Sequence, residues 1–142
     1  MLFDLAEANN SGMILLTESH WNKNIPDEVI NRKGWTIVRS DIVKRICGGV
    51  VGIIREDFPI RAKLNLSTSY CEVMVINFST INLINVTIYR PPECPFEHFS
   101  SALDQTNKWI KNIECNGDTP KVLVNGDFNF RFMSCLGTRN TP

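Results

Sequence analysis

Short apolar runs that end in polar residues recur along this chain of 142 residues. The runs are rich in β-branched side chains and only a few residues long, which is typical of buried strands. They predict strands at 13–16, 35–39, 47–54, 70–78, 81–89 and 122–124. Ser79-Thr80 separates two of these runs and predicts an antiparallel hairpin. The chain is therefore expected to be rich in sheet.

The run 81–89 differs from the others because apolar residues occupy both its odd and its even positions. That pattern predicts a central strand covered on both sides. Pro91 and Pro92 follow it and end sheet pairing, because proline has no amide hydrogen to donate.

A helical period appears in two places and predicts helices at 2–8 and 96–113. In the longer one, apolar residues fall at three- and four-residue steps, and His98 at its start is expected to be a surface residue. A single helical turn is also predicted after Pro26, since proline suits the first helical position.

Polar residues with useful chemistry stand where three of the apolar runs end. Glu18 follows the run 13–16, Tyr89 ends the run 81–89, and Asp127 and Asn129 follow the run 122–124. An extended backbone would point Asp127 and Asn129 to the same side. The alternative is a strand that ends in an ordinary Asx-type turn, for which Asn, Gly and Asp are the usual residues.

These strand ends would meet at one rim if the three strands share an orientation in neighbouring sheets. Carboxylates, a phenol and an amide would then lie together, and carboxylate oxygens are the ligands that Mg²⁺ prefers. Such a set suits hydrolysis of a phosphodiester.

Composition and charge restrict which ligands the chain can bind but do not indicate a function. Fifteen basic and fifteen acidic residues cancel, but residues 31–63 carry eight basic and three acidic side chains. This basic middle either lines a phosphate-binding rim or consists of solvated loop and edge-strand charges. Gly48-Gly49 lacks the spacing of a phosphate-binding loop, so we predict no nucleotide cofactor and a strand kink or bulge at these glycines.

The cysteines and the N-terminus indicate the compartment. The five cysteines include no C-x-x-C pair and predict reduced, structural thiols. We find no membrane-length apolar run and no basic segment of a signal peptide. We therefore expect an intracellular protein, nuclear or cytoplasmic, with no membrane partner.

Taken in order, four motifs resemble the endonuclease/exonuclease/phosphatase superfamily, and most closely the endonuclease domain of non-LTR (LINE-type) retrotransposon polyproteins. The motifs are Leu16-Thr17-Glu18 with Trp21, Cys47-Gly48-Gly49-Val50-Val51-Gly52-Ile53, Tyr89-Arg90-Pro91-Pro92, and Gly126-Asp127-Phe128-Asn129. The resemblance implies an α/β (α+β) four-layered sandwich of two mixed, mostly antiparallel sheets flanked by helices. It also implies DNA cleavage dependent on Mg²⁺ or Mn²⁺.

By position, the resemblance implies a role for each site residue. Glu18 would bind the metal ion, and Tyr89 would contact the scissile phosphate, with Arg90 also at the substrate phosphate. Asp127 would orient or deprotonate the attacking water. Asn129 would hydrogen-bond the phosphate or orient Asp127.

Two family features have no counterpart here. The asparagine of the family's first strand and its final Ser-Asp-His motif are both absent from residues 1–142. We therefore expect a partial domain with weak or absent nuclease activity and with exposed apolar faces and sheet edges. Two alternatives are a phosphatase of the same fold and a non-catalytic retroelement remnant that serves as a binding module.

Overall fold

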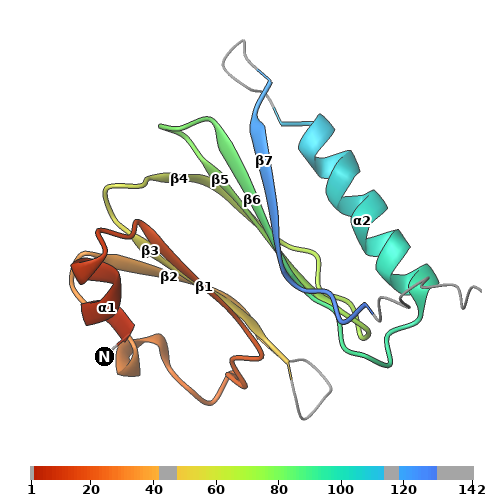
Figure 1. Ribbon diagram of the computed structural model, residues 1–142, viewed down its shortest axis with the longest axis horizontal. Helices are drawn as coiled ribbons and strands as arrows, with labels where there is room; N and C mark the ends of the chain where they lie inside the picture. The colour runs from red at the N-terminus through yellow and green to blue at the C-terminus, as the bar shows by residue number, and fades with distance from the viewer. Residues whose placement is uncertain (1, 42–47, 114–118, 131–142) are drawn as a thin grey trace, which may run out of the picture.

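A computed structural model describes residues 2–41, 48–113 and 119–130. The chain forms four layers: helix α1, a three-stranded sheet, a four-stranded sheet and helix α2 (Figure 1). Helix α1 spans Leu2–Ala8 and α2 spans Phe96–Lys111. No helix among the described residues is long and apolar enough to cross a membrane.

The three-stranded sheet, called sheet A, has the order β1-β3-β2, and the four-stranded sheet, called sheet B, has the order β4-β5-β6-β7. The strands are β1 (Met13–Thr17), β2 (Trp35–Ser40), β3 (Val50–Arg55), β4 (Ile60–Asn65), β5 (Glu72–Phe78), β6 (Leu83–Tyr89) and β7 (Lys121–Asp127). Neighbouring strands are antiparallel except β6 and β7, which are parallel. The predicted sandwich of two mostly antiparallel sheets flanked by helices is confirmed.

Three apolar clusters hold these layers together. One fills the space between the sheets and includes Met74, Ile76 and Phe78 of β5. A second joins sheet B to α2 through Phe99 and Ala102, and a third joins sheet A to α1. Burial of this apolar area supplies the main stabilisation of the sandwich.

Most predicted elements form close to their predicted bounds. The 3-10 turn at Asp27–Val29 lies after Pro26, and β5 and β6 form the predicted hairpin. Strand β6 is buried and lies between two neighbours, as its pattern predicted. The strand β4 was not predicted, although its residues alternate between half-buried and exposed positions.

The prediction of a buried strand at 122–124 is wrong. Val122, Leu123 and Val124 belong to β7 and are exposed by 45%, 44% and 50%. β7 pairs with β6 on one side only, so it is an edge strand in the described part of the chain. Its apolar composition resembled that of a central strand, but a sequence pattern does not show how many neighbours a strand has.

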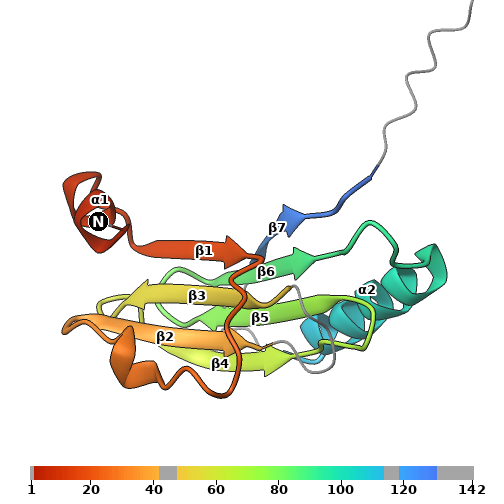
Figure 2. The same cartoon turned by 90° about the horizontal axis from the view of Figure 1, so that it is seen from below.

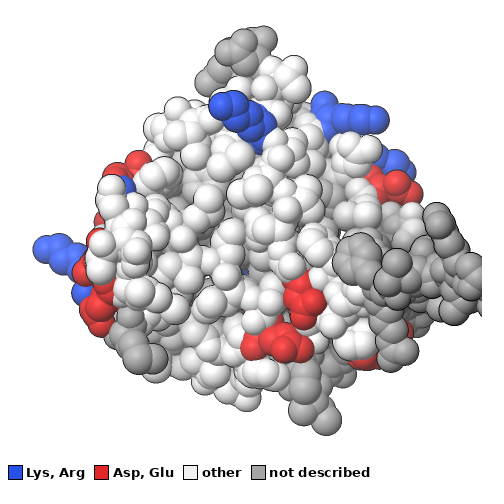
Figure 3. All heavy atoms as spheres, viewed as in Figure 1, with Lys and Arg blue, Asp and Glu red and all other residues white. Residues whose placement is uncertain are grey.

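The two sheets end in edge strands, β1 and β7, on the same side of the sandwich (Figure 2). This side faces the viewer in Figure 1, and Figure 3 shows that most of its surface carries no charge. Acidic side chains gather on it where β1 and β7 end. This is the end at which the predicted site residues lie.

Three of the described basic residues in the middle of the sequence form ion pairs, namely Arg32, Arg39 and Arg55. Arg32 pairs with Asp4 and Glu7 of α1 at 2.8 and 3.0 Å. Arg55 pairs with Asp57 at 2.6 Å. These contacts follow the solvated-charge interpretation for those arginines, while residues 42–47 lie outside the described residues.

Candidate active site

Glu18 and Tyr89 meet across the two sheets although 71 positions separate them in the sequence. The Tyr89 hydroxyl donates a hydrogen bond to Glu18 Oε1 at 2.5 Å. Glu18 is the first residue after β1, and its φ of +52° places it in the left-handed region. A non-glycine residue is strained there, and such strain is retained where the surrounding structure enforces it.

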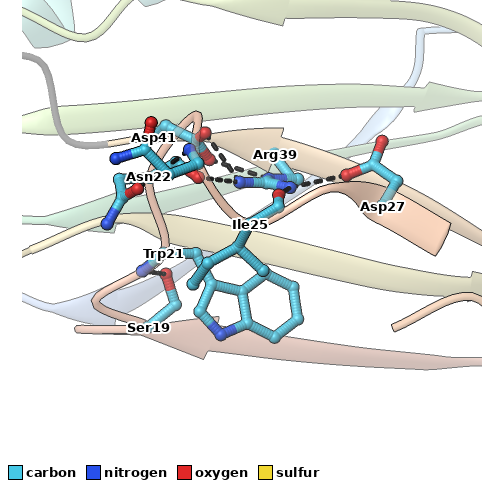
Figure 4. Close-up of polar contacts among 8 residues, drawn as sticks. Ser19, Trp21, Asn22, Ile25, Asp27, Arg39 and Asp41 are labelled. Carbon is cyan, nitrogen blue, oxygen red and sulfur yellow. Dashed lines mark hydrogen bonds and ion pairs between the residues drawn. The ribbon is translucent and has the colours of Figure 1, made fainter. Parts of the chain in front are cut away.

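The loop that begins with Glu18 is held by Arg39 of β2 (Figure 4). The guanidinium donates to the carbonyl oxygens of Asn22 and Ile25 and pairs with Asp27 and Asp41, at 2.6–2.8 Å. Only 12% of the Arg39 side chain is exposed. The five acceptors are the two carbonyl oxygens, one oxygen of Asp27 and both carboxylate oxygens of Asp41. A planar donor group bound to five acceptors at once restricts the loop strongly.

Tyr89 is buried, with 3% of the residue exposed. Burial raises the pKa of its phenol above the ordinary value near 10, and the hydrogen bond to Glu18 raises it further. The negative charges of Glu18, Glu72 and Glu93 act in the same direction. The phenol therefore remains protonated at neutral pH and can act as a hydrogen-bond donor.

The parallel pairing of β6 and β7 places Asp127 directly beside Tyr89. Just beyond this pair, the Arg90 amide donates to the Asp127 carbonyl oxygen at 2.8 Å. Glu18, Tyr89 and Asp127 are thus brought to one rim, each from a different strand end. The site combines two carboxylates with a protonated phenol.

Asn129 and Arg90 are bound to each other rather than directed to an open rim. The chain turns after β7, because the Asn129 amide donates to Asp127 Oδ1 at 3.1 Å in an Asx-type turn. The Asn129 side chain then donates to the Arg90 carbonyl oxygen at 2.9 Å. Of the two alternatives for 127–129, the Asx-type turn forms and the extended backbone does not, since Asn129 has a φ of +45°.

The Arg90 guanidinium donates to three carbonyl oxygens, those of Cys94, Phe128 and Asn129, at 2.7–3.2 Å. It also lies over the Phe130 ring, with 5.0 Å between the guanidinium carbon and the ring centroid. Arg90 therefore holds the segment that follows β7 against the start of α2. A contact with substrate phosphate would require it to exchange some of these bonds.

Gly126 shows why the motif needs a glycine. Its φ is +134°, and a Cβ atom there would lie 1.8 Å from the Ile88 carbonyl oxygen. No side chain fits at such a distance. The glycine lets the end of β7 approach β6 and so permits the pairing of Asp127 with Tyr89.

Glu72 is a site residue that the sequence interpretation missed. It begins β5, is 2% exposed and pairs across the strands with Tyr89. Its carboxylate also packs against Gly48, where an added Cβ would lie 3.0 Å from Glu72 Oε1. The signal was present, because alternation from Met74 places Glu72 on the face toward sheet A.

Gly48 and Gly49 in turn hold the backbone beside Glu18. The Gly49 carbonyl oxygen accepts the Ser19 amide at 3.2 Å, and that of Gly48 accepts the His20 amide at 2.9 Å. Both glycines have positive φ, and β3 begins after them, so they do not form the predicted kink within the strand.

A buried polar network lies along the seam between β6 and β7, beneath the rim. Asn125 donates to Asn85 Oδ1 at 2.6 Å, and Asn85 donates to Thr87 Oγ1 at 2.8 Å. Asn85 and Thr87 are 0% and 1% exposed. Buried amides without partners are costly, so this network favours one register of the parallel pair.

The rim has the donor chemistry for a divalent cation, although the described residues hold no group of three His, Cys, Asp or Glu side chains suited to a metal ion. Mg²⁺ commonly uses one or two carboxylates and completes its shell with water and substrate phosphate. Among the described residues, Glu18 accepts the Tyr89 hydroxyl at Oε1. Glu18 and Asp127 therefore fit such an ion.

Comparison with known proteins gives structural matches only. No protein-family model and no curated protein sequence matches the chain. The 3'-5' exonuclease NExo from Neisseria meningitidis matches with a TM-score of 0.65 and 16% identity, over 91% of this chain and 52% of that one. TDP2 from C. elegans matches with a TM-score of 0.61 and 13% identity, over 92% of this chain and 41% of that one. The human Nocturnin catalytic domain matches with a TM-score of 0.61 and 14% identity, over 92% of this chain and 55% of that one.

The chain thus spans about half the length of the solved structures that it matches. At this level of identity the similarity establishes the fold. NExo, TDP2 and Nocturnin all belong to the endonuclease/exonuclease/phosphatase superfamily, and the described residues of this chain have that superfamily's sandwich fold.

Proposed function

We propose that this chain carries the core of a divalent-metal-dependent phosphodiester hydrolase that acts on DNA. The observation that supports this most strongly is the meeting of Glu18, Tyr89 and Asp127 at one rim. These residues come from two sheets and three strand ends. Structural packing alone gives no reason to gather two carboxylates and a buried phenol there.

Each residue has a role that its surroundings favour. Glu18 would hold the metal ion, and the protonated Tyr89 phenol, which donates to Glu18 in this structure, would turn its single proton to a phosphate oxygen when substrate binds. Asp127 orients the attacking water and accepts its proton. Asn129 and Arg90 position Asp127 through their mutual backbone contacts. A bound Mg²⁺ or Mn²⁺ ion would stabilise the charge that develops on the phosphate.

The DNA-nicking type of LINE-type retrotransposon endonucleases is the finer form of this proposal. Its support is the ordered set of motifs in the sequence, of which Tyr89-Arg90-Pro91-Pro92 is the part that favours the retroelement branch. Two of the similar solved structures are complexes with DNA, TDP2 from D. rerio with a single-strand product and NExo from Neisseria with a hairpin product.

A metal titration tests the site without requiring turnover. Isothermal calorimetry with MnCl₂, followed in parallel by the fluorescence of the chain's three tryptophans, of which Trp21 is the one nearest to Glu18 in the sequence, should show binding to the wild-type chain. Glu18→Gln should weaken the affinity by about tenfold or more, because it removes a charged ligand. Glu28→Gln, which neutralises an exposed acid of the 3-10 turn, is the matched control and should bind normally. Equal binding by both variants would contradict the metal role of Glu18.

A cleavage assay tests the reaction. The chain lacks the Ser-Asp-His motif, and losing such groups costs orders of magnitude in rate. We therefore expect at most slow nicking of supercoiled plasmid with Mg²⁺ or Mn²⁺, and none from Asp127→Ala. Nicking that persists in Asp127→Ala would reject the assigned base. A wild-type chain that binds no metal would instead favour the non-catalytic binding module.

A further inference from the structure

Tyr70 and His98 form a face-to-face aromatic stack on the surface. Their ring centroids are 3.7 Å apart, and the ring planes differ by 10°. Aromatic pairs usually prefer offset or edge-to-face arrangements with wider centroid separations. Three of the other ring contacts in the described chain are indeed edge-to-face. The close parallel stack is therefore imposed by the backbones that carry the two rings.

Both backbones are firmly anchored. The hydroxyl of Thr68 accepts the amides of Tyr70 and Cys71, each at 3.1 Å, and Cys71 is fully buried. His98 lies in the first turn of α2, next to the buried Phe99. The rings are thus fixed in place while Tyr70 remains 41% exposed and His98 exposed. A preorganised aromatic surface loses little conformational entropy when it binds a flat ligand.

The stack lies at the same end of sheet B as the candidate active site. Tyr70 is two residues before Glu72, the cross-strand partner of Tyr89. Tyr70 lies in the turn, closed by the Thr68 amide on the Cys71 carbonyl oxygen at 2.8 Å, that leads into β5. His98 belongs to the helix that follows Arg90. A nucleic acid strand with a phosphodiester at Tyr89 would continue past the end of sheet B at which these rings lie.

We propose that Tyr70 and His98 form a stacking platform for an unpaired base of the DNA strand, adjacent to the phosphodiester that is cut. This rests on the proposed function, and it adds a contact that reads the base rather than the backbone. Every nucleobase has a flat face that can stack on an aromatic ring, so the platform tolerates any sequence. Its neighbour Glu97 is an acid, which disfavours a phosphate at the same place.

Fluorescence anisotropy with a labelled single-stranded DNA oligonucleotide, in EDTA, tests the platform apart from catalysis. Tyr70→Leu and His98→Leu should each weaken binding by roughly tenfold. Tyr70→Phe keeps the ring and should bind as the wild type does. Phe96→Leu is the matched control, since it removes another exposed aromatic ring from the first turn of α2.

The second ligand is an oligonucleotide of the same length made of abasic sites. Binding of this backbone should be unaffected by Tyr70→Leu, because it offers no base to stack. The platform is overturned if the wild-type chain does not bind the DNA oligonucleotide or binds both oligonucleotides equally. It is also overturned if Phe96→Leu weakens binding as much as Tyr70→Leu does. These outcomes leave the proposed hydrolysis to be judged by the Mn²⁺ titration, which involves neither ring.

Discussion

Tyr89 links the two sheets at the candidate site through its hydrogen bond to Glu18. Its hydroxyl is buried, and three nearby carboxylates oppose its ionisation. The elevated pKa of this phenol is therefore a property of the folded state only. An unfolded chain would ionise Tyr89 near pH 10, as model peptides do.

This difference predicts a loss of stability at high pH. Below about pH 10 the phenol is protonated in both states, so its contribution is fully present. As the pH rises further, the unfolded state releases a proton that the folded state keeps. The free energy of unfolding should then fall by up to about 1.4 kcal/mol per pH unit from this group. Urea unfolding of the wild type and Tyr89→Phe between about pH 9 and 11 should show a steeper fall in the wild type.

The control is Tyr70→Phe, which removes the other tyrosine hydroxyl from an exposed ring. The steep fall should disappear only in Tyr89→Phe. If the free energy of unfolding falls with pH at the same rate in the wild type and in Tyr89→Phe, the folded state does not shield the Tyr89 phenol from ionisation.

Gly126 permits a different test at the residue scale. Gly126→Ala must place a methyl group against the Ile88 carbonyl and also keep a positive φ. We expect a loss of about 3 kcal/mol or more in the free energy of unfolding. Gly34→Ala is the matched control, because Gly34 has a φ of +87° but no atom within 4 Å of an added Cβ. It should cost only about 1 kcal/mol. If thermal unfolding shows equal losses of stability in the two variants, backbone strain, and not the contact with β6, explains the effect of Gly126→Ala.

At the scale of elements, the parallel pair of β6 and β7 decides which side chains share the rim. A slip of one residue would turn Asp127 to the other face of the sheet, away from Tyr89. The Asn125, Asn85 and Thr87 network is satisfied in the observed register. We infer that these polar side chains select the register that the apolar residues of β7 do not specify.

A double-mutant cycle measures this coupling. Asn125→Leu should cost about 1–3 kcal/mol, because it leaves the buried Asn85 carbonyl oxygen without its donor. Asn85→Leu with Asn125→Leu should cost at least about 1 kcal/mol less than the sum of the single changes. Asn77→Leu is the control partner, since Asn77 is also buried but lies on β5, and its effect should add to that of Asn125→Leu. Additivity in both pairs would refute a role for the network.

At the scale of the whole molecule, the sandwich that the described residues form has two edge strands on one side. Strands β1 and β7 both end their sheets there, and β7 exposes apolar residues along an edge (Figure 2). Unpaired strand edges with apolar side chains favour pairing with another chain. The largely uncharged surface in Figure 3 offers little electrostatic opposition to this.

We therefore expect the purified chain to self-associate reversibly as its concentration rises. Val122→Lys with Val124→Lys should shift sedimentation-velocity profiles toward the monomer, because charges on an edge strand oppose pairing. Both positions are about half exposed, so folding should be retained. Val29→Lys with Leu103→Lys adds the same charge at exposed apolar positions away from this edge and should not change association. A wild-type chain that stays monomeric at all concentrations would refute this.

Much of the architecture could be predicted from local pattern. Periodicity located α2, and apolar runs located β1, β2, β5 and β6, because burial acts on each segment through its own side chains. Residue types at strand ends selected Glu18, Tyr89 and Asp127 as candidates for a common rim. The amphipathic β4 was not predicted although its residues alternate, and its Arg61 and Lys63 are charges of an edge strand.

What the sequence determined by itself is therefore most of the helices and strands, β4 excepted, and the chemistry carried at their ends. The tertiary structure decided how many neighbours each strand has, which exposed β7, and how the chain turns at Asn129. It also decided that Glu72 lies beside Tyr89 and that Tyr70 stacks on His98. Those features depend on pairing between segments distant in the sequence. Their energies arise only when the segments meet, so no local pattern records them.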